Sequence, residues 1–532
     1  MTGRRPHVAV IGGGITGLTA AYFLQETARE QGRPLSVSLL EASDRLGGKI
    51  LTERVDGFCI EAGPDSFLAR KPWARQLAER LGLGQELVPT DPRHRRTYIL
   101  HGGRLHPIPE GLFMFVPVDL GAFLRTRLFS PLGKARMALE PFIPKGPAGD
   151  ETIARFVTRR AGREALERLA EPLLTGIYSG RADRLGIMST FPQLKEMEQR
   201  TGSLVKSFLA GRSGGAAGGA RPGAKASGTG AGPKAGAAGP GANGAAGGGG
   251  ANAGAGDSAF LALRGGLATL VETLTQRLDG VSVRTGIRVT EIAAHPAGQP
   301  FAPGAGHIGE TALAPAIYSL TLSDGTRFQA DAVIVAVPAY VAAQLIGPIC
   351  PEAVPHLQAI RFVSTITCVL GFDRASVQHP LDGSGFLVPR REGRCITACT
   401  WVSSKWAHAA KPDQALIRCY LGRDGEQEAL GWSDEEVAVA VRRELKELMG
   451  ITAEPRLARV YRWERAMPQY EVGHRERVAA IEGSLARHPG LILAGASYHG
   501  VGVPDCIRQG QDAAERILSY VFGKGRQHPG VE

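Results

Sequence analysis

Several features are scarce or missing in this chain, and each absence excludes a class of protein. No run of about 18 apolar residues occurs, so we expect no membrane-spanning helix. The seven cysteines form no CxxC pair and no Cys/His group with zinc spacing. This excludes a disulfide scaffold and predicts reduced thiols in a cytoplasmic protein. No stretch of lysine and arginine is interleaved with aromatic residues, so nucleic acid ranks last among the partners.

The composition is that of a folded protein with more than one domain. The 532 residues exceed one ordinary domain, and 43% of them are hydrophobic against 21% charged. Lysine and arginine number 62 against 51 aspartates and glutamates, a formal charge of +11. This excess fits an acidic ligand or an anionic membrane surface. The first six residues lead straight into an apolar strand, so we expect no signal peptide.

Glycine is in marked excess, with 71 residues, and much of it falls in the segment 211–256. Most residues of this segment are Gly or Ala, which bury too little apolar area to offset the backbone entropy lost on folding. We therefore predict a disordered loop there. A shorter stretch rich in Pro and Gly, 296–315, is interpreted as a second loop insertion.

A glycine-rich turn between a strand and a helix indicates a nucleotide site. Residues 7–11 are a short apolar run typical of a buried parallel strand, and 18–28 have helical apolar spacing. Between them, Gly12 permits a tight turn, Gly14 lets the backbone approach a pyrophosphate, and Gly17 lets helix and strand pack closely. The free N–H groups of the helix N-terminus would attract the phosphates.

Glu41 directly follows the next expected strand, 35–40. A carboxylate at this position accepts hydrogen bonds from an adenosine ribose and would repel a 2′-phosphate. FAD and NAD therefore fit better than NADP.

Three further segments resemble motifs of the FAD-dependent amine oxidase and desaturase superfamily. Residues 42–49 are similar to its second dinucleotide motif, R-x-G-G-K/R, in which Arg45 and Lys49 can meet phosphate charge. Residues 61–66 resemble the loop that passes near the flavin ring, and 330–338 resemble the A-D-x-V-I-x-A-x-P strand. The cofactor is therefore expected to be FAD.

Four segments resemble the protoporphyrinogen and coproporphyrinogen oxidase family within this superfamily. They are G-I-Y-S-G at 176–180, S-T-F-P at 189–192, W-E-R-A-M-P-Q-Y at 463–470 with His474 beyond, and A-G-A-S-Y-H-G-V-G-V-P-D-C-I at 494–507. Residues 395–401 resemble the Gram-positive-type bacterial branch of the family more weakly. The motifs extend over almost the whole chain, and neither loop insertion falls on one.

The resemblance implies oxidation of a porphyrinogen by FAD, with molecular oxygen as the electron acceptor. The Gram-positive-type branch acts on coproporphyrinogen III, with protoporphyrinogen IX as the alternative substrate. The resemblance places the following residues around FAD: Gly12, Gly13, Gly14, Ile15, Thr16, Gly17, Glu41, Ala42, Lys49, Gly63, Pro64, Asp65, Ser66, Val289, Trp463, Val501, Gly502 and Val503.

The substrate's propionate groups need cations. Arg70 and Lys71 follow the 63–66 loop closely and are predicted to contact these groups at the mouth of the flavin pocket. Tyr178 and Tyr420 are weaker candidates, for which core packing is the favoured interpretation. Because the flavin carries the chemistry, no catalytic side chain and no metal site are expected.

The predicted fold is α/β with an added α part: a discontinuous Rossmann-like FAD domain, an antiparallel-sheet substrate domain and a helical insertion. The expected boundaries are 1–90, 257–340 and 475–525 for the FAD domain, 91–210 for the helical domain, 211–256 for the disordered insertion and 341–474 for the substrate domain.

Other functions and partners stay open at this point. A flavin amine oxidase or carotenoid desaturase shares the N-terminal motifs, but it should lack the segments at 467–470 and 504–506. A non-catalytic escort protein would be expected to lose the dinucleotide turn. The family resemblance also raises contact with a downstream haem-pathway enzyme and peripheral membrane contact. The candidate for the membrane contact is the apolar run 111–117, for which core packing in the helical domain is the favoured interpretation.

Overall fold

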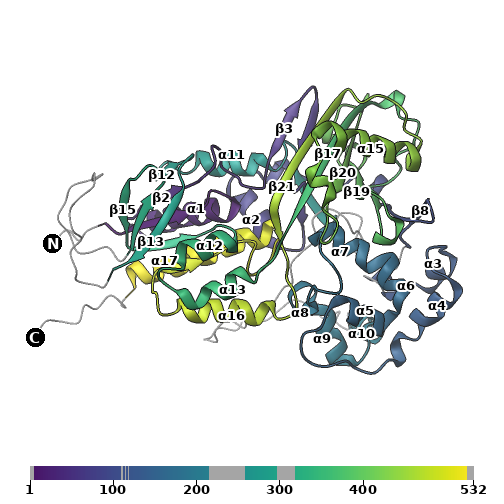
Figure 1. Cartoon of the computed structure of the whole chain (residues 1–532), viewed down its shortest axis with the longest axis horizontal. Helices are drawn as coiled ribbons and strands as arrows, with labels where there is room; N and C mark the ends of the chain where they lie inside the picture. Colours follow the sequence, from purple (N-terminus) through teal and green to yellow (C-terminus); the bar gives the residue numbers. More distant parts are fainter. Residues whose placement is uncertain are drawn as a thin grey trace, which may run out of the picture.

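A five-stranded parallel sheet forms one end of the molecule, at the left of Figure 1. The computed structural model describes residues 5–109, 112–113, 116–117, 119–214, 258–295 and 318–523. The strand order is β12-β2-β1-β16-β22, with β12 (Val281–Arg284), β2 (Ser36–Leu40), β1 (His7–Ile11), β16 (Ala332–Val335) and β22 (Leu491–Leu493). Segments far apart in the sequence thus form one sheet, whose central strands β1 and β16 are short, apolar and covered on both faces.

Two layers cover this sheet. Val8 and Val10 of β1 face a core shared with helices, whereas Ala9 and Ile11 face a core shared with a second sheet. The helices of the first layer are α1 (Ile15–Glu30), α2 (Pro72–Arg80), α11 (Ala268–Gln276) and α17 (Val503–Phe522). The second layer holds β13 (Val289–Ala294), β14 (Tyr318–Leu322), β15 (Arg327–Ala330), α12 (Ala339–Ile346), α13 (Val354–Gln358) and α16 (His474–Leu485). We call these elements together the dinucleotide region.

A seven-stranded, mostly antiparallel sheet occupies the upper right of Figure 1. Its order is β21 (Leu457–Pro468), β17 (Phe362–Asp373), β20 (Gln414–Leu421), β19 (Ile396–Trp401), β18 (Gly385–Leu387), β7 (Thr97–His101) and β8 (Arg104–Pro107). The helix α15 (Asp434–Met449) packs on it, and α14 (Val402–Lys405) follows β19. The N-cap of α15 is Ser433, which forms a capping box with Glu436. We call this part the sheet region.

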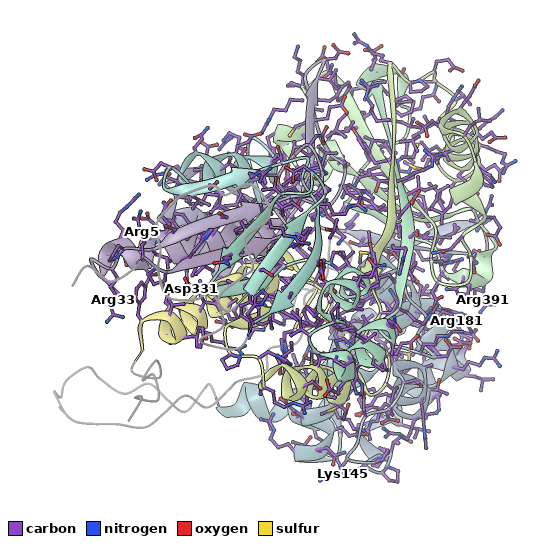
Figure 2. The ribbon with its side chains drawn as sticks, turned by 60° about the vertical axis from the view of Figure 1, so that its left-hand side comes forward. Arg5, Arg33, Lys145, Arg181, Asp331 and Arg391 are labelled. Carbon is purple, nitrogen blue, oxygen red and sulfur yellow. The ribbon has the colours of Figure 1, made fainter. Side chains whose placement is uncertain are left out.

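Helices at the lower right of Figure 1 form a third part, the helical region. They are α3 (Leu120–Arg125), α4 (Pro131–Ala138), α5 (Ile153–Ala161), α6 (Arg163–Ala165), α7 (Glu171–Tyr178), α8 (Ile187–Thr190), α9 (Pro192–Thr201) and α10 (Leu204–Gly214), with the short strands β9 (Leu112–Phe113) and β10 (Val116–Pro117). Lys145 marks the base of this region in Figure 2, while Arg5 and Arg33 lie on the dinucleotide region.

Short strands connect the regions. They are β3 (Thr52–Val55), β4 (Phe58–Glu61), β5 (Phe67–Leu68), β6 (Leu87–Pro89) and β11 (Phe260–Leu263). The strand β11 pairs with both β5 and β6, so the chain after residue 257 returns to the segment that follows the first dinucleotide motifs.

Three expected boundaries differ from the structure. Residues 97–107, expected in the helical domain, form β7 and β8 of the sheet region, because β7 pairs with β18. Residues 339–358, most of them expected in the substrate domain, form α12 and α13 in the core of the dinucleotide region. The helix α10 extends to Gly214, so 211–214 are helical rather than loop. The rest of the 211–256 segment and all of 296–315 lie outside the described residues.

Gly17 holds α1 against the strand that precedes it, as the sequence predicts. A Cβ atom built on Gly17 would lie 1.9 Å from the carbonyl oxygen of Gly12. By contrast, Gly483 in α16 has open space at its Cβ position.

We expect Gly17→Ala to lower the free energy of unfolding by about 1–3 kcal/mol, because the added methyl group overpacks the turn. The control Gly483→Ala should leave stability unchanged or raise it by up to about 1 kcal/mol. Urea denaturation of both variants measures this difference, and equal stabilities would contradict the packing role of Gly17.

Candidate functional site

A cavity of about 880 Å³ opens where the three regions meet. Its wall includes Ile11, Leu40 and Ala336 from the dinucleotide region, Gly176 and Ile177 from the helical region, and Tyr420, Met467 and Pro468 from the sheet region. The strand β1 lies between β2 and β16, and the chain leaves these strands at the cavity. Such a switch point is where open α/β sheets bind ligands.

The glycine turn provides a backbone cradle at one end of the cavity. Gly12 has φ of +103°, a left-handed conformation that favours glycine. Gly14 precedes α1 and has no side chain that could cap the helix. The backbone N–H groups in the first turn of α1 therefore remain available to a ligand. Glu41 accepts hydrogen bonds from Gly13 N at 2.6 Å and Ser43 N at 2.8 Å, which fixes its carboxylate beside the turn.

Most residues that the family resemblance assigned to FAD line this cavity. They are Gly12, Gly14, Ile15, Thr16, Glu41, Ala42, Lys49, Gly63, Pro64, Asp65, Val289, Trp463, Val501 and Val503. The others, Gly13, Gly17, Ser66 and Gly502, are not part of the lining. Gly13 holds Glu41, Ser66 Oγ donates to Asp65 Oδ1 at 2.6 Å, and Gly502 caps α17. Contact of each residue with FAD stays a prediction.

The loop after β4 is held in place from two sides. Trp463 Nε1 donates to the carbonyl oxygen of Ala62 at 2.9 Å. Arg418 Nη1 donates to the carbonyl oxygens of Glu61 and Gly63 at 2.8 and 3.2 Å. A Cβ on Gly63 would lie 2.0 Å from the carbonyl oxygen of Lys49, so the loop also needs this glycine to approach the second dinucleotide motif.

A buried ionic group lies behind that loop. Asp65 Oδ2 accepts from Arg418 Nη2 at 2.7 Å and from Lys405 Nζ at 3.2 Å. Burial by itself would raise the pKa of Asp65, but the two cations hold it well below its usual range. Burial raises the pKa of the neighbouring Glu61 to about 7. The charged side chains therefore fix one wall of the cavity.

The prediction that Lys71 binds a propionate at the pocket mouth does not fit the structure, and the same prediction for Arg70 stays untested. Lys71 is 4% exposed, and its Nζ donates to both carboxylate oxygens of Asp505, at 2.7 and 2.6 Å. Burial lowers the pKa of Lys71, while Asp505 opposes the shift. Arg70 is exposed, and neither residue lines the cavity. The error arose because proximity in sequence to the 63–66 loop says nothing about a partner on α17.

The two tyrosine candidates lie in different places. Tyr420 lines the cavity, and the Arg418 guanidinium lies 5.0 Å from the centre of its ring. Tyr178 is fully buried outside the lining, with its ring 6.1 Å from that of Tyr470. Tyr178 therefore packs in the core, as the favoured interpretation had it, and Tyr420 remains a candidate for substrate contact.

The P-Q-Y…H motif ties the cavity walls together. Gln469 Nε2 donates to the carbonyl oxygen of Tyr178 at 2.8 Å, which joins the end of β21 to α7. Tyr470 OH donates to the carbonyl oxygen of Ala496 at 2.6 Å, and the ring of His474 stacks on Tyr470 with centres 4.0 Å apart. Burial lowers the pKa of His474 to about 4, so this ring is neutral near pH 7.

Several wall residues escaped the sequence analysis. Arg418 gave a usable signal, because it is a charged residue in the otherwise apolar strand 416–421. Tyr340 and Arg465 gave no usable signal, because the contact between them depends on how α12 packs against β21. All seven cysteines are free, and the described part of the chain contains no group of His, Cys, Asp or Glu fit to hold a metal ion.

Because Lys71 and Asp505 are both buried, each single substitution removes the opposite charge from a buried ion pair. We expect Lys71→Met and Asp505→Leu each to lower the free energy of unfolding by about 3–5 kcal/mol, and the double variant to lose much less than their sum. The control Arg75→Met breaks an exposed pair with Glu79 and should cost less than about 1 kcal/mol. Additive losses in denaturant titrations would argue against a direct pair.

Comparison with known proteins agrees with this geometry. The family model "Flavin containing amine oxidoreductase" matches residues 15–518. The chain is 38% identical to a coproporphyrinogen III oxidase of Bacillus subtilis, over 98% of this chain and 100% of that protein. It is 33% identical to a coproporphyrinogen III oxidase of Staphylococcus aureus, over 96% and 99%.

A solved structure extends the likeness to three dimensions. The crystal structure of a protein from Exiguobacterium sp. 255-15, assigned provisionally as a protoporphyrinogen oxidase, superposes with a TM-score of 0.77. It is 33% identical, and the match covers 97% of this chain and 99% of that one. The chain therefore belongs to the flavin containing amine oxidoreductase family and, within it, to the coproporphyrinogen III oxidases.

Proposed function

We propose that this protein binds FAD and oxidises coproporphyrinogen III to coproporphyrin III, with molecular oxygen as the electron acceptor, as a cytoplasmic step of haem biosynthesis. The observation that carries the proposal is the continuous cavity that begins at the dinucleotide turn and ends between the sheet and helical regions. Protoporphyrinogen IX is the alternative substrate. Full-length similarity to coproporphyrinogen III oxidases supports the first choice.

The residues present fit a flavin dinucleotide. An added side chain at Gly14 would meet nothing within 4 Å, so the backbone there is open to a ligand. Val501 and Val503 bring the N-terminus of α17 to the same cavity, which adds a second positive helix end. Burial lowers the pKa of Lys49, and no carboxylate of the described residues pairs with it. A bound phosphate or flavin oxygen would compensate that ammonium.

The division of roles follows from this arrangement. A bound flavin would supply the electron sink for hydride equivalents removed from the saturated carbons of the macrocycle. The glycine turn and Glu41 hold the nucleotide end. Trp463 and Arg418 fix the 62–65 loop, and the helical region closes the other side of the cavity and excludes water.

The charge of the cavity favours an anionic substrate. Its cationic lining residues are Lys49, Arg288, Arg418 and Arg465, and its acidic ones are Glu41 and Asp65. Both acids are engaged, Glu41 by backbone N–H groups and Asp65 by two buried cations. Coproporphyrinogen carries four carboxylates and protoporphyrinogen two. Because Arg418 is held by Asp65 and Lys49 would meet the cofactor, Arg288 and Arg465 are the lining cations left to attract carboxylates of a substrate.

We expect the FAD-loaded enzyme to turn over coproporphyrinogen III with a kcat/KM at least about tenfold higher than protoporphyrinogen IX. The extra carboxylates would make charge-assisted hydrogen bonds that the second substrate lacks. Side-by-side fluorescence assays of both products measure the ratio. Glu41→Ala, which should lose FAD, serves as the background control. Equal or reversed preference would assign the alternative substrate.

An exposed apolar patch on the helical region supports a peripheral membrane contact. It consists of Leu124, Leu132, Leu139 and Phe142, of which Leu132 and Phe142 are 83% and 79% exposed. Leu132 and Leu139 are seven residues apart, so they share one face of α4 and its end. Lys134 Nζ donates to the carbonyl oxygen of Leu124, which holds α3 beside α4. No helix of the described residues is long and apolar enough to cross a bilayer.

The exposed bases Arg125 and Arg127 adjoin this patch, so an anionic lipid surface is the occupant that we propose. The lipid contact of the candidate run 111–117 stays a prediction. Leu112 is buried in the helical core, and the other side chains of the run lie outside the described residues.

We expect the protein to sediment with anionic vesicles at low salt and less at high salt, because salt screens the attraction to arginine. The double variant Leu132→Ser with Phe142→Ser should lose binding. Val439→Ser, which changes an exposed valine on α15, should keep it. Absence of sedimentation of the wild-type protein at low salt would rule out the lipid contact.

A further inference from the structure

Arg465 lies in a bulge of β21. Thr365 pairs with Trp463 and Val363 with Met467, so three residues of β21 lie opposite Ser364 alone. Arg465 has φ of +44°, a left-handed conformation that is uncommon for a residue with a side chain. Its N–H donates to Ser364 Oγ at 2.8 Å. Bulges of this kind redirect side chains, and such backbone strain concentrates at functional sites.

The bulge aims Arg465 at an aromatic ring on the dinucleotide region. The centre of its guanidinium lies 3.7 Å from the ring centre of Tyr340, at the start of α12. Tyr340 is itself held edge-on by Phe362, with ring centres 5.0 Å apart. A guanidinium stacked on a ring face keeps its in-plane N–H groups free for a second partner.

The other arginines of β21 have acidic partners, and Arg465 differs from them. Arg459 pairs with Glu53, and Arg462 pairs with Asp434. No carboxylate among the described residues lies within ion-pair distance of the Arg465 guanidinium, although it lines the cavity. Arg465 is exposed, and a strained, stacked cation that no carboxylate pairs with at a cavity wall is suited to an anion that arrives with a ligand.

The cationic residues that line the cavity lie on different elements of the fold. Lys49 is the last residue of the second dinucleotide motif, Arg288 adjoins Val289, and Arg418 is committed to Asp65. Arg465 instead precedes Met467 and Pro468, on the strand end that Gln469 ties to the helical region. Among the cationic lining residues, Arg465 thus lies on the strand end that the sheet region shares with the helical region.

We propose that Arg465 is a specificity-determining residue that binds one carboxylate of the substrate's propionate arms, with Tyr340 as the platform that orients its guanidinium. The proposal rests on the proposed function and goes beyond it by naming the residue that recognises the acidic arm. The planar guanidinium gives two parallel N–H···O bonds to one carboxylate, which a lysine cannot reproduce.

The test compares Arg465→Gln and Arg465→Lys with the wild-type FAD-loaded enzyme. Coproporphyrin III, the product, is titrated and its Kd measured by fluorescence, and KM and kcat are measured with coproporphyrinogen III. We expect Arg465→Gln to raise Kd and KM by roughly tenfold to a hundredfold with little change in kcat, and Arg465→Lys to recover only part of the loss. The control Arg475→Gln removes the same charge from an exposed position on α16 and should behave as wild type.

A neutral ligand provides the second arm of the experiment. The tetramethyl ester of coproporphyrin III has no carboxylate, so wild type and Arg465→Gln should bind it equally. FAD dissociation constants of the two apoproteins should also agree. The proposal is overturned if Kd for coproporphyrin III is unchanged, if the ester shows the same loss, or if the variant loses FAD instead. Product binding is measured without turnover, so a failure of the proposed oxidation would appear separately, in the wild-type assay.

Discussion

The cavity of this protein depends on buried ion pairs that join segments far apart in the sequence. Lys71 meets Asp505 across 434 positions, and Asp65 meets Arg418 across 353. Both pairs are almost inaccessible to water. A buried charge without its partner costs several kcal/mol, so these contacts strongly disfavour any arrangement in which the segments separate. They hold the loop after β4, α17 and the sheet region in one geometry around the ligand space.

Much of the family's recognisable sequence serves this positioning rather than ligand contact. Gln469 and Tyr470 connect β21 to α7 and to the turn before α17. Asp505, in the P-D-C segment, is the partner of Lys71. The walls that these residues hold then present backbone N–H groups, helix ends and a few cations to the cavity. This division suits a reaction in which a cofactor carries the chemistry and the protein binds, orients and excludes water.

The sequence predicted what depends on neighbouring residues. The turn from Gly12 to Gly17 and the short strand that ends just before Glu41 are both local, and the structure confirms them. Lys71 was assigned wrongly because its partner lies at the far end of the chain. The role proposed for Arg465 could not be predicted either, since a bulge between paired strands and a ring on another element leave no periodic signal.

The central claim is that a flavin held at the dinucleotide turn and a coproporphyrinogen at the opposite wall occupy one continuous cavity. Anaerobic mixing of the FAD-loaded enzyme with coproporphyrinogen III, followed by flavin absorption near 450 nm, tests this most directly, because electrons then have no acceptor beyond the flavin. The account predicts that the flavin band bleaches at substoichiometric substrate and returns when oxygen is admitted. A band that persists with excess coproporphyrinogen, in enzyme that retains its FAD, would contradict it.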